Sequence, residues 1–480
     1  MSSPNTILRE GTWFTSVRLA GTALSSIISV LLARVLAPTD YGFFAMATAF
    51  TGAAALINEC GLGPAIVQQR DLNQTQLDSC FWLSLIWSAA LYGVIFASAP
   101  LVALFFGEGR LVPLVRVIGL NLVIGSVGVV PDNLLMRTMN FKKRSLTEFI
   151  GIVVQGGAAY LLAIRGFGVW SLVVGALIGS VTSVLCLFAA FPWRPAGGLR
   201  LRQIREMLNF GANLTGSRVL WYSYSNADNV IVAKCLDAQA LGLYSMAYDL
   251  ATRPLQKVTI LINQLAFPIF SQRQDEIQAT KQYFLQATRY IGMLAMPAMA
   301  GAILVAPELV DTLLAKKWSA MTTPFRLLCG VSVLQALAAI IPPLLNSRGK
   351  AHLNLRYSLV CFGVMPLSLL VGVRYGLNAV ALTWLIVYPF LFCYLLRIGL
   401  REIGLSIEEY LRALLPTVAV TSVMILAVAA FRSAAVGYLD SPSILVGSVL
   451  IGVVAYSGVL VLTSDEIRSG SLRVLAALRP

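Results

Sequence analysis

The sequence predicts an all-α polytopic membrane protein with about 14 transmembrane helices, and three observations support this fold class. First, the chain of 480 residues is 58% hydrophobic and only 12% charged, whereas soluble proteins carry about 25% charged residues. Second, the apolar residues form runs of about 20, the length that crosses a bilayer as a helix. Third, these runs do not alternate between apolar and polar residues, as barrel strands do. This composition excludes a disordered chain, a secreted disulfide scaffold and an ordinary cytosolic enzyme.

The expected spans follow one another with short polar connections. They are placed at residues 13–36, 42–66, 79–105, 111–135, 146–164, 169–191, 210–236, 242–268, 284–304, 322–345, 357–375, 379–396, 413–431 and 444–462. The first run contains Arg18 and is too long for a cleavable signal peptide, so we expect it to remain as a membrane helix. The longest outer connection, residues 305–321, is expected to be a loop.

The Lys and Arg residues of the short connections predict the orientation of the chain. With the N-terminus in the cytoplasm, 21 of the 36 Lys and Arg residues of the chain lie on the cytoplasmic side, eight on the opposite side and seven within spans. This bias predicts that both termini are cytoplasmic. The net charge of +14 is then a topology signal that faces anionic membrane lipid, and nucleic acid is excluded as the partner.

An internal repeat organises the chain. A shift of 200 residues aligns residues 11–47 with the second half without a gap, and it matches Gly42 with Gly242 and Arg18 with Arg218. Six spans separate the copies, so both have the same orientation and the repeat is parallel. We expect a six-helix bundle at 1–191, a basic cytoplasmic linker at 192–209, a second six-helix bundle at 210–396, and two additional helices with a cytoplasmic tail at 397–480.

The two copies of the repeat carry a resemblance to a known family. The stretches LLARVLAPTDYGFFAMATAF, VIVAKCLDAQALGLYSMAYDLATRPLQ and AFPIFSQRQDE resemble bacterial polysaccharide exporters of the Wzx type. These belong to the multidrug/oligosaccharidyl-lipid/polysaccharide exporter (MOP) superfamily, with the lipid II flippases and the MATE drug exporters. The resemblance implies two bundles around a cavity that opens alternately to each membrane face. It also implies transport of an undecaprenyl-pyrophosphate-linked oligosaccharide from the inner to the outer leaflet of the bacterial inner membrane, for lipopolysaccharide or exopolysaccharide biosynthesis. The partners it implies are a polysaccharide polymerase and glycosyltransferases.

Charged residues inside the spans form the candidate site, because a charge at the bilayer centre costs about 2.5–3.5 kcal/mol on insertion scales. Arg18 and Arg218 each lie about two turns inside a span and begin a polar helical face. These faces contain Thr22, Ser25 and Ser29 in the first copy, and Tyr222, Ser225 and Asn229 in the second. They predict a cavity wall; the alternative is helix–helix packing through Ser and Thr. Three further cations, Arg116, Arg289 and Arg326, lie near span ends, where their side chains can extend to the interface.

A second group of charges lies in the eighth span. Asp249, Arg253 and Lys257 are four residues apart and share one helical face. The carboxylate can neutralise one cation, and the remaining positive charge suits a diphosphate. We therefore expect Arg18, Arg218, Arg253 and Lys257 to bind the pyrophosphate of the substrate; the alternative for the eighth span is a purely structural ion pair.

Three carboxylates are candidates for ion coupling: Asp228, Asp249 and Glu59. Carboxylates inside a membrane commonly mark proton or sodium sites, although Asp228 could instead pair with a neighbouring arginine. With one histidine and no CxxC spacing, the chain carries no zinc or haem motif. We expect no cofactor.

Two other functions compete with the flippase interpretation. A drug or cation exporter on the same fold would favour an acidic cavity, whereas the cavity candidates here are net cationic. A polytopic glycosyltransferase or polymerase would need catalytic residues on an outer loop, and residues 305–321 contain no recognisable constellation. No GxxxxGK[ST] motif is present, so we expect neither ATP hydrolysis nor another enzymatic activity.

Overall fold

The computed structural model describes residues 4–58, 62–69, 72–204, 222, 226–272 and 276–463. These residues are helical or lie in short connections, and they contain no β-strand beyond an isolated bridge between Val436 and Leu439. The predicted all-α class is therefore confirmed. Contacts divide the chain into two compact units, Met1–Gly242 and Leu243–Pro480.

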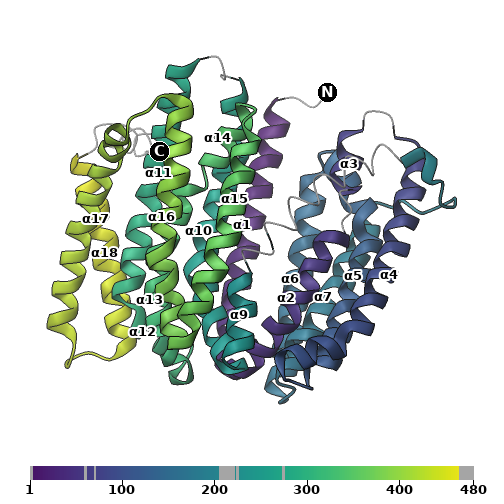
Figure 1. Cartoon of the computed structure of the whole chain (residues 1–480), viewed down its shortest axis with the longest axis horizontal. Coiled ribbons are helices and arrows are strands. Elements are labelled where there is room, and N and C mark those ends of the chain that lie inside the picture. Colours follow the sequence, from purple (N-terminus) through teal and green to yellow (C-terminus); the bar gives the residue numbers. More distant parts are fainter. Residues whose placement is uncertain are drawn as a thin grey trace, which may run out of the picture. The chain divides into compact units, whose positions relative to one another are not determined.

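The first unit is built from long helices that lie side by side. It contains α1 (Pro4–Val35), α2 (Pro38–Asn58), the short α3 (Leu62–Gln68), α4 (Gln74–Phe106), α5 (Leu111–Arg137), α6 (Phe141–Ile164), α7 (Val169–Ala190), the 3₁₀ turn η1 (Leu201–Ile204) and α9 (Ala227–Cys235). Helix α6 packs against α1 and α7, and α5 packs against α4 and α7 (Figure 1). An Asn73–Gln76 capping box begins α4, and Gly107 ends it with a φ of 76°.

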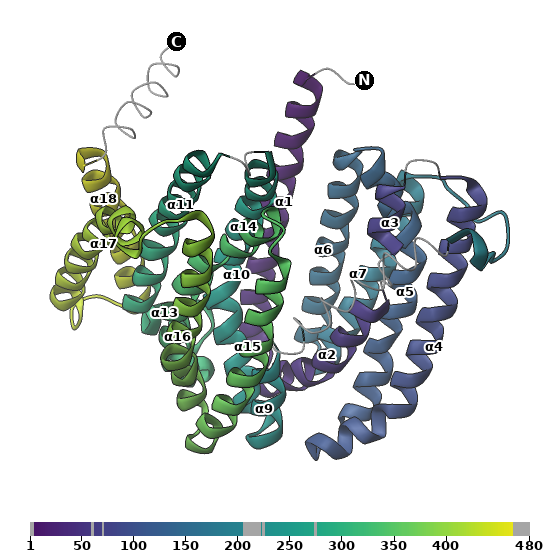
Figure 2. The ribbon, with the colours of Figure 1, turned by 45° about the horizontal axis from the view of Figure 1, so that its top comes forward.

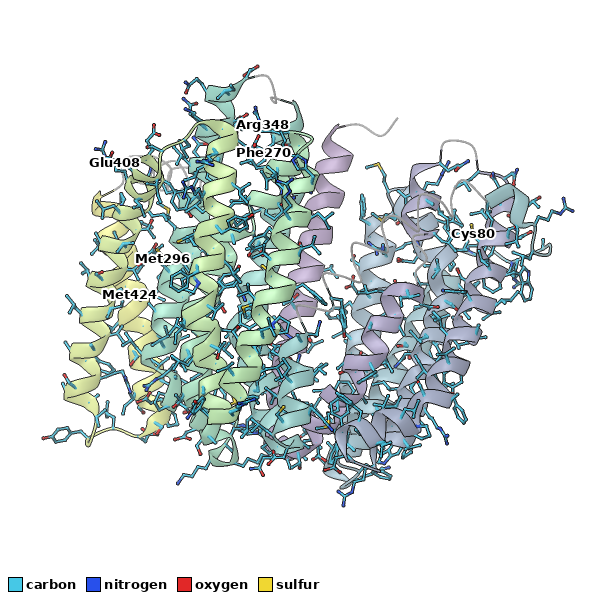
Figure 3. The ribbon with its side chains drawn as sticks, in the orientation of Figure 1. Cys80, Phe270, Met296, Arg348, Glu408 and Met424 are labelled. Atoms are coloured by element: carbon cyan, nitrogen blue, oxygen red, sulfur yellow. The ribbon has the colours of Figure 1, made fainter. Side chains whose placement is uncertain are left out.

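The second unit is also helical. It takes in most of α10 (Ala238–Gln272), followed by α11 (Ile277–Leu304), α12 (Ala306–Leu313), η2 (Lys316–Met321), α13 (Thr322–Ala338), α14 (Ile341–Ser347), α15 (Ala351–Gly372), η3 (Val373–Tyr375), α16 (Leu377–Ile403), α17 (Ile407–Ala435) and α18 (Ser441–Thr463). Helix α13 packs against α16 and α11, and α17 packs against α11 and α18 (Figure 2). Met424 of α17, which is labelled in Figure 3, is buried and lies next to Gly452 of α18.

Within the described residues, 11 helical segments are long and apolar enough to cross a membrane. They coincide with predicted spans two to six and nine to fourteen, which confirms a polytopic membrane protein. The other three predicted spans fall on α1, on α10 and on the stretch that includes α9. The total of about 14 spans, the boundaries of the four predicted domains and the orientation of the termini stay predictions.

The expected outer loop at 305–321 was wrong, because most of it is helical. Pro307 cannot donate a hydrogen bond from its nitrogen, and it lies in the first turn of α12, where a missing N–H is tolerated. The chain therefore ends α11 at Leu304 and begins a new helix. Glu308 of α12 forms a 2.6 Å ion pair with Arg432 of α17, and both side chains are largely buried. This pair ties the first of the two additional C-terminal helices to α12.

In each repeat a proline leaves a backbone carbonyl of the third long helix without a helical N–H partner, and an arginine of the next long helix binds that carbonyl. Pro100 of α4 removes the N–H that would bond the carbonyl of Phe96, and Arg116 Nε donates to that oxygen at 3.3 Å. In the second copy the carbonyl of Ile303 lies in the last turn of α11, and Pro307, in the first turn of α12, has no N–H to offer it.

The arginine that acts in the second copy is Arg326 of α13. Its Nε donates to the Ile303 oxygen at 3.1 Å, about 210 residues after the equivalent contact of Arg116. A third carbonyl follows the same rule: Pro297 of α11 frees the Met293 oxygen, and the hydroxyl of Tyr456 donates to it at 2.7 Å. Neighbouring helices thus satisfy the backbone groups that these prolines release in the membrane.

The first unit also brings two matched glycines of the repeat together. A Cβ added to Gly42 would lie 1.7 Å from the carbonyl oxygen of Ala238, and one added to Gly242 would lie 1.8 Å from that of Pro38. Pro38 and Ala238 are themselves matched by the repeat shift. The first turns of α2 and α10 therefore meet in a reciprocal backbone contact that only glycine permits.

Candidate functional site

Helix α10 positions the best-described part of the predicted anion site. An Asp237 carboxylate oxygen accepts a hydrogen bond from the N–H of Ala240 at 2.6 Å, in the first turn of the helix. Four turns further on, Arg253 Nη2 lies 2.5 Å from Asp249 Oδ2. The structure thus contains the ion pair that the i, i+4 spacing indicates.

The Arg253–Asp249 pair is open on one side. The side chain of Arg253 is 60% exposed and that of Asp249 is 40% exposed. A planar guanidinium has five N–H donors and can bind a carboxylate while it offers further donors to phosphate oxygens. Asp249 can therefore hold the Arg253 guanidinium in a fixed direction, and the remaining donors of that guanidinium can bind an anionic ligand.

The other three predicted phosphate ligands lie outside the described residues or side chains. Arg218 lies outside the described residues, whereas Arg18 lies on α1 and Lys257 on α10, with side chains that are not described. Ser225 and Glu59 also fall outside the described residues. Their roles in phosphate binding, cavity lining and ion coupling stay predictions.

The polar face of α1 is described from Thr22 onward. Thr22 and Ser25 are half-buried, and the carbonyl of Thr22 accepts a hydrogen bond from the hydroxyl of Ser26 at 3.0 Å. Hydroxyl groups that bond the preceding helical turn can be tolerated in apolar surroundings, because their donors are satisfied.

The matching polar face of the second copy contacts α2. The hydroxyl of Tyr222 lies 3.4 Å from the carbonyl oxygen of Thr48, and it sits against Gly52, where an added Cβ would lie 2.1 Å from that hydroxyl. Tyr222 is half-buried. In this conformation the tyrosine packs against α2, and its place in a cavity wall stays a prediction.

The candidate coupling residue Asp228 is 1% exposed at the start of α9. Its Oδ1 accepts a hydrogen bond from the backbone N–H of Asn229 at 2.8 Å. The helix dipole stabilises a carboxylate in the first turn of a helix. A neighbouring cation is therefore not the sole possible source of stabilisation for the buried Asp228 carboxylate. No group of three His, Cys, Asp or Glu side chains that could hold a metal occurs among the described residues.

Sequence reasoning missed the arginines that bind the proline-freed carbonyls, although both cations were noted near span ends. A usable signal exists: an Ala-Pro pair at 99–100 and again at 306–307, each followed by an arginine in the next apolar helix. The side-chain Nε of each arginine donates to a backbone carbonyl oxygen, and these contacts differ in kind from the exposed Arg253–Asp249 ion pair.

Several named bacterial proteins are similar in sequence to most of this chain. Teichuronic acid biosynthesis protein TuaB of Bacillus subtilis is 23% identical over 84% of this chain and 86% of its own length. Lipopolysaccharide biosynthesis protein WzxC of Escherichia coli is 22% identical over 76% of this chain and 75% of its own. Succinoglycan biosynthesis transport protein ExoT of Rhizobium meliloti is 26% identical over 65% of this chain and 64% of its own.

Solved structures show the same fold. The lipid II flippase MurJ in an inward closed conformation matches 95% of this chain and 99% of its own with a TM-score of 0.76 and 14% identity. An inward-facing MATE transporter of the MOP superfamily matches 79% of this chain and 94% of its own with a TM-score of 0.64 and 18% identity. The sequence relatives confirm the predicted resemblance to polysaccharide exporters of the Wzx type. A family model described as polysaccharide biosynthesis protein matches residues 31–323, and the chain belongs to that family.

Proposed function

We propose that this protein is a flippase that moves an undecaprenyl-pyrophosphate-linked oligosaccharide from the inner to the outer leaflet of the bacterial cytoplasmic membrane. Transport by alternating access, without catalysis, would supply lipid-linked units for surface polysaccharide biosynthesis. The names of TuaB, WzxC and ExoT support the polysaccharide, and the fold shared with the lipid II flippase supports a lipid-linked substrate.

The observation that carries the proposal is the exposed Arg253–Asp249 pair near the middle of α10. A guanidinium facing lipid there would cost about 2.5–3.5 kcal/mol on insertion scales, whereas a wet cavity with an anionic substrate removes that cost. Together with Arg18, Arg218 and Lys257, Arg253 would attract the doubly charged headgroup while the polyprenyl tail stays in lipid. Asp228, Asp249 and Glu59 would then be the carboxylates available for coupling to an ion.

A drug exporter is the second candidate, because a MATE transporter shares the fold. The two functions differ in the charge of the cargo. A cationic drug would be repelled by the proposed arginine and lysine cluster, whereas a pyrophosphate would be attracted.

Deletion of the gene, followed by leaflet-resolved analysis of lipid-linked glycans, tests the proposal. We expect loss of one surface polysaccharide and accumulation of its lipid-linked unit in the inner leaflet, restored by the intact gene. Units that reach the outer leaflet but stay unpolymerised would indicate a polymerase instead. Unchanged polysaccharide with increased drug sensitivity would indicate a drug exporter.

A further inference from the structure

The linker after α7 is folded onto the beginning of α4 in the first unit. We call residues 192–204 the linker strap. Its Trp193 and Ile204 side chains are buried in an apolar cluster with Phe81 and Cys80, of which Cys80 is labelled in Figure 3. The rings of Trp193 and Phe81 lie 5.6 Å apart. The strap is therefore a packed element and not a simple tether.

Main-chain groups of the strap make most of its polar contacts with α4. The contacts are Gln74 Nε2 to the Arg194 oxygen at 3.0 Å, the Ala196 N–H to Asp78 Oδ1 at 3.2 Å, Trp82 Nε1 to the Gly197 oxygen at 2.7 Å, and the Arg200 N–H to Ser79 Oγ at 3.0 Å. Asp78 and Ser79 are both buried. Because Arg194 and Arg200 dock through their backbones, their exposed side chains are directed away from this docking contact.

The position of Trp82 indicates how deep the linker strap lies relative to the membrane surface. This residue lies where the polar first turns of α4 give way to its apolar stretch, and tryptophan is enriched at the membrane–water interface. Its hydrogen bond to Gly197 holds the strap at the same level. Just beyond this point Leu199 is 37% exposed and Leu201 is 52% exposed, on either side of the exposed Arg200.

We propose that the linker strap is a binding site for an anionic phospholipid of the cytoplasmic leaflet, such as phosphatidylglycerol. Arg194 and Arg200 bind the headgroup phosphate, and Leu199 and Leu201 contact the upper acyl chain. Alternating leucines and arginines supply both halves of this recognition, since an arginine offers paired donors to phosphate and an apolar neighbour lies in the interface. The bound lipid holds the connection between the two repeats at the membrane surface.

Titration of the purified full-length protein in detergent with phosphatidylglycerol, followed by thermal unfolding, measures this binding. The double variant Arg194→Gln with Arg200→Gln should bind phosphatidylglycerol about thirtyfold more weakly, from about 1 kcal/mol for each arginine near an anionic surface. Its unfolding midpoint without lipid should stay at the wild-type value, because the strap docks through its backbone. The matched control is Arg110→Gln with Arg165→Gln, which removes two exposed cations of the same unit and should leave the affinity unchanged.

Four results would overturn the proposal. Equal loss of affinity in the control pair would mean that net charge alone attracts the lipid. Equal stabilisation by phosphatidylcholine, or by glycerol phosphate without acyl chains, would remove the anionic lipid as the specific ligand. A lowered midpoint of the Arg194/Arg200 variant without lipid would show that these guanidinium groups hold the strap itself. Replacement of Leu199 and Leu201 by serine should weaken binding of phosphatidylglycerol, and unchanged affinity there would also contradict the site.

Discussion

Replacing Tyr456 with phenylalanine tests whether a proline-freed carbonyl anchors α18. The change removes only the hydroxyl that donates to the Met293 oxygen at 2.7 Å and keeps the aromatic ring. A hydrogen bond of this kind contributes about 1 kcal/mol net, and interhelical bonds in membranes average about 0.6 kcal/mol with a maximum near 1.7. We therefore expect the free energy of unfolding to fall by about 1 kcal/mol, roughly a fivefold change in the unfolding equilibrium.

The second half of this test is a double-mutant cycle with Pro297→Ala, measured by unfolding in mixed micelles with increasing SDS. An alanine restores the N–H that can bond the Met293 oxygen along the helix. In that background Tyr456→Phe should cost less than half as much as in the wild type. Tyr438→Phe is the matched control, since Tyr438 is 89% exposed and its change should have little effect. An equal cost of Tyr456→Phe in both backgrounds would refute the role assigned to the proline.

Three further predictions concern packing, an ion pair and topology. Gly42→Val should abolish the folded protein in detergent, as judged by size-exclusion of a fluorescent fusion, because its Cβ would lie 1.7 Å from a carbonyl oxygen; Gly93→Val, with no atom within 4 Å of the added Cβ, should fold, and folding of both would contradict the contact. Glu308→Gln should destabilise the protein by about 3–5 kcal/mol because it leaves the largely buried Arg432 unpaired, and the paired change with Arg432→Met should recover most of this loss; no recovery in unfolding measurements would argue against the pair. In a cysteine-free background, a cysteine at Lys142 should react with impermeant reagent only from the cytoplasm and one at Arg110 only from outside; the reverse pattern would overturn the orientation.

Hydropathy predicted the helices well because burial in lipid imposes the same apolar run on every span, whatever its neighbours. Local spacing also predicted the Arg253–Asp249 pair, since residues four apart meet on any helix. Contacts between distant residues gave no such local pattern. The carbonyl partners of Arg116 and Arg326 depend on prolines that lie in other helices. The hydropathy of 305–321 likewise did not show that a new helix begins there, with Pro307 in its first turn. The linker was predicted, but its packing against α4 was not, because its polar contacts use backbone groups, which no residue type reveals.

The central claim is that cationic side chains within the membrane spans bind the pyrophosphate of a lipid-linked glycan. The most direct test is translocation of such a glycan in proteoliposomes. They contain wild-type protein, Arg253→Ala, Arg253→Lys, Lys257→Ala or the control Arg374→Ala, which removes another exposed cation of the second unit. We predict that Arg253→Ala abolishes translocation at wild-type protein levels, that Arg253→Lys retains part of it where charge matters more than paired donors, and that Arg374→Ala is unaffected. Wild-type translocation by both Arg253→Ala and Lys257→Ala would contradict the anion site and leave the Asp249 contact as a structural ion pair.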